Sequence, residues 1–274
     1  IGEDRKLIDT AYSFEAMVDE IIFTSCPVIA TIFASIFYPA AAIFAAMAFL
    51  AVGAVLFLLQ RNTEPPAHPK EPGDDHSLLI KDRFIRALFI PMMMVGAFFS
   101  STGLVIVGYS DEYGVREYSG LFIAIWSLSS GISAFISGTI HWKLNEAKRF
   151  IRSLIALTLL TLPIFLSAQI FPGNPWIMAL VLFINGLAIA PLLTAGLAVA
   201  ERSVSEKRTT EVLAWAIAAL NLGGAIPTAL TCYIIDTFGP SVAFIVPVGC
   251  VAIAMLTLLP YYSVWRQKMA QIPA

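Results

Sequence analysis

The stretch RTTEVLAWAIAALNLGGAIPTALTCYIIDTFGPSVAF, residues 208–244, decides the fold class. It contains an uncharged run from Val212 to Ile235, longer than the roughly 20 apolar residues that cross the hydrocarbon core of a bilayer as a helix. With this run, the apolar runs of the chain occupy residues 16–37, 40–60, 87–108, 119–141, 153–171, 175–200, 212–235 and 242–263. Because lipid offers the backbone no hydrogen-bond partner, each run must be a helix. We therefore predict an all-α polytopic membrane protein with eight transmembrane helices.

The composition excludes most other classes of protein. Of the 274 residues, 58% are hydrophobic and only 13% are charged, which lies outside the range of ordinary globular domains. The net charge of −2 gives no basic surface for nucleic acid. The three cysteines lie inside apolar runs and the three histidines lack metal-ligand spacing, so we expect no disulfide and no metal site. No glycine-rich phosphate loop follows a strand, and we expect neither an enzyme active site nor a cofactor.

The basic residues follow the pattern of a membrane protein with both ends in the cytoplasm. If the first apolar run starts on the cytoplasmic side, every lysine and arginine except Arg116 falls on that side. Membrane-protein loops rich in lysine and arginine stay in the cytoplasm. We therefore expect both termini to be cytoplasmic, in agreement with an even number of spans.

One long hydrophilic segment divides the chain. Residues 61–85 are rich in proline, a composition typical of a flexible linker, here expected to be cytoplasmic. We expect residues 1–60 to form the last two helices of an N-terminal half, and residues 86–274 to form a six-helix C-terminal half. A weak internal repeat supports this division, because Glu15 and Glu211 stand at the starts of the first and seventh runs and the turns after these runs match. Repeated halves of six helices are known among transporters.

Three segments carry a family resemblance. They are FEAMVDEIIFTSCPVIAT (residues 14–31), GLFIAIWSLSSGISAFISGTIHW (residues 120–142) and the stretch at residues 208–244. Together they resemble the major facilitator superfamily, in particular its bacterial efflux permeases. The resemblance implies that the chain corresponds to helices five to twelve of this family's fold and is N-terminally truncated, so that the missing N-terminal helices would normally complete the fold. It also implies an integral protein of the bacterial cytoplasmic (inner) membrane.

The same resemblance implies transmembrane transport of a small molecule by alternating access, in which two halves rock about a central site. Proton-coupled efflux by an antiporter is the preferred hypothesis, with the lipid bilayer, an amphipathic small-molecule substrate and protons as partners. The segment CPVIAT, residues 26–31, is similar to an antiporter signature and also favours export. Two alternatives stay open: an inactive truncated remnant or non-transporting membrane scaffold, and a solute importer of the same superfamily.

Three carboxylates, Glu15, Asp19 and Glu20, stand at the start of the first run. In one hypothesis they close a cytoplasmic gate by pairing with basic residues on the same side of the membrane. In a second, Asp19 or Glu20 faces the cavity and carries a proton or a cationic substrate. In a third, they are solvated interfacial charges without a role. The other gate candidates are Lys143, Lys148, Arg149 and Glu211. The family resemblance implies that the usual partner of Glu211 is a loop that this chain lacks.

Polar and helix-breaking residues inside the runs supply further candidates. Asn185 and Asn221 are the polar residues nearest the middles of the sixth and seventh runs, and Trp215 lies one turn after Glu211. Each is a candidate for substrate contact, although buried amides usually bond to a neighbouring helix and tryptophan usually packs. The residues expected to kink or interrupt helices are Pro27, Pro191, Gly223, Gly224 and Pro227.

Overall fold

The structure is a computed structural model that describes residues 18, 21–22, 25–26, 29–30, 33, 37–38, 40–61, 79–139, 145–261, 263–265 and 267. Every regular element in this part of the chain is helical. Seven segments are long and apolar enough to cross a membrane: Ala41–Leu59, Arg83–Glu112, Ser119–Ser137, Glu146–Ile170, Pro175–Glu201, Thr209–Phe238 and Pro240–Tyr261. They match the second to eighth predicted runs and confirm the all-α membrane fold. The first predicted run, residues 16–37, lies mostly outside the described residues.

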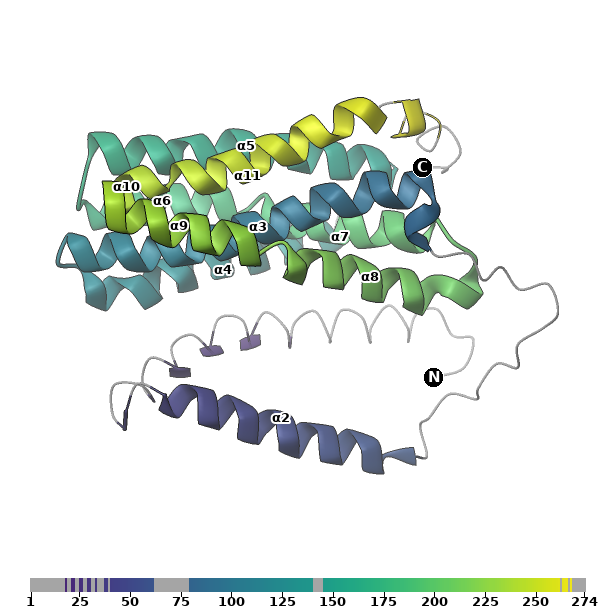
Figure 1. Ribbon diagram of the computed structural model, residues 1–274, viewed down its shortest axis with the longest axis horizontal. Coiled ribbons are helices and arrows are strands. Elements are labelled where there is room, and N and C mark those ends of the chain that lie inside the picture. Colours follow the sequence, from purple (N-terminus) through teal and green to yellow (C-terminus); the bar gives the residue numbers. More distant parts are fainter. Residues whose placement is uncertain are drawn as a thin grey trace.

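The spans are built from the following helices, which Figure 1 shows along the chain: α2 (Ala41–Leu59), α3 (Arg83–Glu112), α4 (Ser119–Thr139), α5 (Glu146–Ile170), α6 (Pro175–Gly186), α7 (Ile189–Glu201), α8 (Thr209–Leu222), α9 (Ala225–Phe238), α10 (Pro240–Ala243) and α11 (Ile245–Leu258). Short 3-10 turns flank them at Leu79–Lys81, Arg116–Tyr118, Glu206–Arg208 and Leu259–Tyr261. Three spans therefore consist of two helices each: α6 with α7, α8 with α9, and α10 with α11.

Side-chain caps set the starts of several spans. The carboxylate of Asp82 accepts hydrogen bonds from the backbone N–H groups of Phe84 (2.6 Å) and Ile85 (3.3 Å) at the start of α3. The amide of Asn145 accepts from Lys148 N (3.0 Å) at the start of α5. These bonds satisfy backbone donors that have no partner inside the helix. The cap at Asn145 explains why α5 begins at Glu146, well before residue 153, where the apolar run alone had placed its start.

The α3 helix is the centre of the bundle. It packs against α4, α8, α9 and α11, while α5 packs against α6, α7 and α11. More than half of the apolar part of α3 is buried (56%), against 17% for α8 and α9 together. In contrast, α2 lies apart from this bundle (Figure 1), and Ala41 at its start is its one buried residue.

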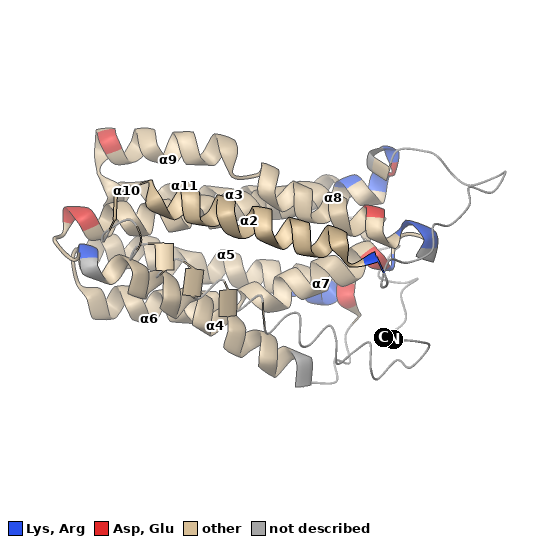
Figure 2. Ribbon diagram, turned by 90° about the horizontal axis from the view of Figure 1, so that it is seen from below, with Lys and Arg blue, Asp and Glu red and all other residues tan. Residues whose placement is uncertain are grey.

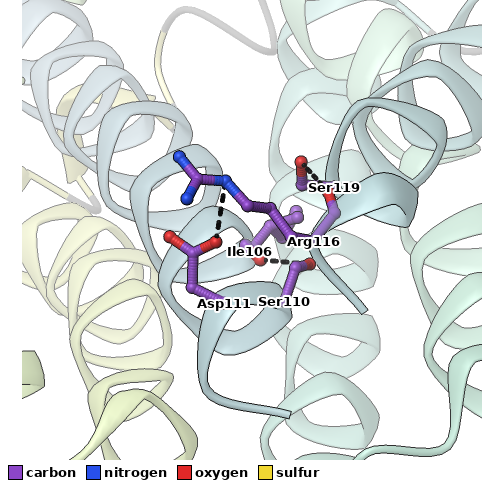
Figure 3. Close-up of polar contacts among 5 residues, drawn as sticks. All are labelled: Ile106, Ser110, Asp111, Arg116 and Ser119. Carbon is purple, nitrogen blue, oxygen red and sulfur yellow. Dashed lines mark hydrogen bonds and ion pairs between the residues drawn. The ribbon is translucent and has the colours of Figure 1, made fainter. Parts of the chain in front are cut away.

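The charged residues gather at the two ends of the helices, as Figure 2 shows. The described lysines and arginines stand at the starts of α3, α5 and α8 and at the ends of α2 and α7, all at one end of the bundle; only Arg116 lies at the other. Arg116 pairs there with Asp111 at 3.2 Å, and its side chain is 82% exposed (Figure 3). Such an exposed pair contributes about 0–1 kcal/mol to stability.

At each end of the bundle, side-chain contacts join neighbouring segments to one another. At the basic end, the ring of Trp265 stacks on Phe150 of α5 (centroids 5.4 Å apart, planes at 4°) and meets Phe84 of α3 edge-on at 5.2 Å. At the opposite end, the hydroxyl of Tyr109 accepts from Gly173 N at 2.7 Å, and Gln169 Nε2 donates to Ser241 O at 2.6 Å.

Candidate functional site

Two of the three interruptions begin four residues before a proline, and the third begins three residues before one. The breaks follow Gly186, Leu222 and Ala243, and the prolines are Pro191, Pro227 and Pro247. A proline lacks the N–H that would bond to the carbonyl four residues earlier, and its ring clashes with that carbonyl. The first two breaks lie near the middles of their spans, at Leu187 and at Gly223–Gly224, whereas the third lies near an end.

The break between α8 and α9 rests directly on the backbone of α3. A Cβ added to Gly223 would overlap the carbonyl oxygen of Met93, and one added to Gly96 of α3 would overlap the carbonyl oxygen of Leu220 in α8. A Cβ added to Gly224 would also overlap, less severely, the side-chain hydroxyl of Ser100. Only residues without a side chain allow two helices to approach in this way. The buried residues of α8 are Val212, Ala216 and Ala219, so small side chains line this helix up to the break.

A chain of buried hydrogen bonds holds the other mid-span break. Trp126 Nε1 of α4 donates to Asn185 Oδ1 of α6 at 2.9 Å, and Asn185 Nδ2 donates to Thr161 Oγ1 of α5 at 3.1 Å. The Thr161 hydroxyl then donates to Leu157 O at 2.7 Å. All three side chains are at least 93% buried, with Trp126 the most exposed at 7%. This geometry favours the helix-joining interpretation of Asn185.

The residue after Asn185 brings α6 onto α4. A Cβ added to Gly186 would overlap the hydroxyl of Ser129 and the carbonyl oxygen of Trp126. The indole of Trp126 is also enclosed by two rings of α3, those of Phe98 (5.8 Å) and Phe99 (5.9 Å). The segment just before the break is therefore fixed to α4 and α5. In contrast, no side chain of α8 or α9 hydrogen-bonds to another of the numbered α-helices within the described part of the chain.

The two candidates on α8 have a different setting. The Trp215 side chain is 42% exposed, and Asn221 is exposed and donates to Ile217 O of its own helix at 3.1 Å. Asn221 lies on the face of α8 opposite the buried residues of this helix, whereas Trp215 lies at the edge of that buried face. Neither reaches another described helix through a hydrogen bond.

Ion pairs at the basic end include one that the sequence pattern did not single out. Glu146 at the start of α5 accepts from Arg202 at the end of α7 (3.0 Å), and the Glu146 side chain is only 15% exposed. Glu211 forms a local two-bond pair with Arg208, at 3.0 and 3.2 Å. The predicted lack of its usual partner therefore does not leave the Glu211 carboxylate unpaired.

Comparison with known proteins identifies the family. The family model of the Major Facilitator Superfamily matches residues 5–174, more than half of the chain. The chain belongs to the major facilitator superfamily. A search of curated proteins gave no match. The matched region extends to Asn174, the cap residue of α6, so the two mid-span breaks lie beyond it.

Members of the major facilitator superfamily are membrane transporters rather than enzymes, and the chain is an integral membrane protein of this family. Of the remaining candidates, the structure describes only Lys148 and Arg149. Lys148 is exposed on α5, whereas Arg149 is half-buried. The candidates Glu15, Asp19, Glu20, Pro27 and Lys143 lie outside the described residues. The gate and the proton carrier therefore stay predictions for this major facilitator protein.

Proposed function

We propose that the protein exports an amphipathic small molecule in exchange for protons by alternating access. The observation that carries the proposal is the pair of spans interrupted at mid-membrane, α6 with α7 and α8 with α9. They are neighbours, because α7 packs against α8, and both spans contact α3. Interrupted helices at the midplane are where transporters of several folds bind substrate and bend. The exposed side chains of α8 include Trp215 and Asn221, an aromatic ring and an amide on different faces of the helix, either of which could contact an amphipathic molecule.

The orientation follows from the charge distribution. The end of the bundle that carries the basic residues is proposed to face the cytoplasm, since lysine and arginine are retained there. In this orientation both termini are cytoplasmic and the Asp111–Arg116 pair is external. The membrane is proposed to be the bacterial inner membrane, as the efflux-permease resemblance implies.

Asp19 and Glu20 are the proposed proton carriers. The described spans hold acidic residues only near their ends, at Asp111, Glu112, Glu146, Glu201, Glu211 and Asp236. A carboxylate that is protonated from one side and deprotonated from the other must reach the interior of the bundle. Those six acids lie outside the predicted apolar runs, whereas Asp19 and Glu20 lie inside the run at residues 16–37, near its start. Asp19 also shares a helix face with Glu15.

We expect Asp19→Asn to abolish proton exchange, because an amide cannot carry a proton. The measurement uses the protein in liposomes that enclose the pH dye pyranine, with ethidium added outside as the amphipathic probe. Ethidium entry through the unsubstituted protein should drive protons out and raise the internal pH. The Asp19→Asn protein should give no pH change.

Asp111→Asn is the matched control, because it makes the same chemical change in an exposed carboxylate near the C-terminal end of α3. It should leave the pH change intact. A pH response that survives Asp19→Asn would remove Asp19 as the carrier. If folded, unsubstituted protein moves neither ethidium nor protons, the scaffold alternative is supported instead.

The gate is proposed to involve Glu15 with Arg149, which is the half-buried cation of α5. Arg149→Glu should slow ethidium transport about tenfold, because like charges at the closed mouth destabilise that state by about 1.4 kcal/mol. Adding Glu15→Lys to this variant should restore part of the rate. If the charge swaps of Glu15 with Lys143, Lys148 and Arg149 all give no restoration, the gate hypothesis is wrong.

A further inference from the structure

The outer face of α5 combines two features in one stripe. Lys148 and Arg152 are exposed in its first two turns, and below them the stripe continues through Ile155, Leu159, Leu162 and Leu166. These apolar side chains are between 39% and 60% exposed. The spacing of four, three, four, three and four residues keeps all six on one face of a helix.

This face is turned away from the other helices that the structure describes. α5 packs through its other faces against α6, α7 and α11. In Figure 1 it lies on the side of the bundle opposite α2. The stripe therefore faces the lipid, with its two cations at the level where a headgroup would sit.

The two cations are not neutralised by the described part of the protein. Neither Lys148 nor Arg152 forms an ion pair with a described residue, and the acid nearest to them on α5, Glu146, is held by Arg202. Side chains four residues apart on a helix have Cβ atoms about 5–6 Å apart. One phosphate group can therefore accept hydrogen bonds from both, as the long basic side chains extend toward the interface.

We propose that this stripe binds one anionic phospholipid of the leaflet at the basic end of the bundle. Its phosphate lies between Lys148 and Arg152, and an acyl chain lies along Ile155, Leu159, Leu162 and Leu166. Lys148 is also a gate candidate from the sequence, but the proposed gate uses Arg149, and none of the stripe residues lies at the mid-span breaks or in the buried hydrogen-bond chain.

The start of α3 supplies a matched comparison. Arg83 and Arg86 are exposed at the same end of the bundle, but the side chains beneath them, Ile90, Met93 and Met94, are half-buried. This surface has the same charge without an exposed apolar stripe below it. General attraction of anionic lipid to basic residues would act on both places equally, whereas a built lipid site would act only on α5.

Native mass spectrometry of the whole protein, titrated with dioleoyl phosphatidylglycerol or dioleoyl phosphatidylcholine, tests the site. The first phosphatidylglycerol should bind about tenfold more tightly than phosphatidylcholine, since each basic residue favours the anionic headgroup. Lys148→Gln with Arg152→Gln should remove this preference, and phosphatidylcholine, whose phosphate is balanced by its choline cation, should lose less binding than phosphatidylglycerol. Arg83→Gln with Arg86→Gln should change the preference less than about twofold. Leu159→Asn should weaken the binding of both lipids.

Two outcomes would overturn the site. One is an equal loss of phosphatidylglycerol binding in the α3 and α5 double variants, which would indicate only a general basic surface. The other is the absence of any preference in the unsubstituted protein. All substituted side chains are exposed, and an unchanged far-ultraviolet circular dichroism spectrum confirms that each variant is folded. Ethidium transport does not enter the test, so failure of the lipid site leaves the transport proposal standing.

Discussion

Gly223→Ala is expected to destabilise the helix bundle by about 1–3 kcal/mol, the usual cost of overpacking, and to reduce ethidium transport strongly. The added methyl group would occupy the position of the Met93 carbonyl oxygen of α3, so the two helices would have to separate. No flexible side chain stands between these backbones to absorb the change. Gly96→Ala should have the same effect, because its methyl group would meet Leu220 O from the other side.

The control for this prediction is Gly103→Ala, on the same helix as Gly96. A Cβ at Gly103 meets no atom within 4 Å, and alanine is a better helix former than glycine by about 1 kcal/mol. This variant should be as stable as the parent or slightly more stable in thermal unfolding in detergent. Equal behaviour of Gly223→Ala and Gly103→Ala in both stability and transport would show that the close contact of α3 with α8 and α9 does not matter.

Substitutions in the buried hydrogen-bond chain should show strong coupling. Trp126→Phe removes the donor to Asn185 Oδ1, and Asn185→Leu removes the partners of both Trp126 and Thr161. Each single change should cost about 1–3 kcal/mol, because it leaves a buried polar group without a partner. The double variant should cost less than the sum of the two, since Trp126 and Asn185 then no longer leave each other unsatisfied.

Thermal or denaturant unfolding of the four proteins measures this coupling. Interhelical hydrogen bonds in membrane proteins contribute about 0.6 kcal/mol on average, so the coupling should reach or exceed that value here. Asn221→Leu is the control, because the Asn221 amide is exposed and bonds only to its own helix. Strict additivity of Trp126→Phe and Asn185→Leu would contradict the role assigned to the chain.

The spans could be predicted from sequence because a single local property, apolar length, determines them. The interruptions were partly predictable because they also depend on a local property: a proline removes the hydrogen bond to the carbonyl four residues before it. Proline alone is not sufficient, however: Pro91 and Pro163 lie inside α3 and α5 without ending either helix. What distinguishes Pro227 is the Gly223–Gly224 pair before it and the neighbouring backbone that these glycines accommodate.

The partners of the polar residues could not be predicted. Trp126 and Asn185 are 59 residues apart, and their pairing depends on how α4 and α6 lie side by side. The same holds for Glu146 and Arg202, where the sequence directed attention to the neighbouring Lys148 and Arg149. Amphipathicity indicates which face of a helix is buried, but it does not indicate which helix covers that face.

The contact of α3 with α8 and α9 has a consequence for how such a protein can change over generations. At Gly96 and Gly223 the distance between the helices is set by main-chain atoms, and no amino-acid substitution removes main-chain atoms. Random mutation at these two codons can only add atoms, and so it can only push the helices apart. On the proposed function, a change of transported compound would therefore come from exposed side chains of α8, such as Trp215, while the glycine contact with α3 stays the same.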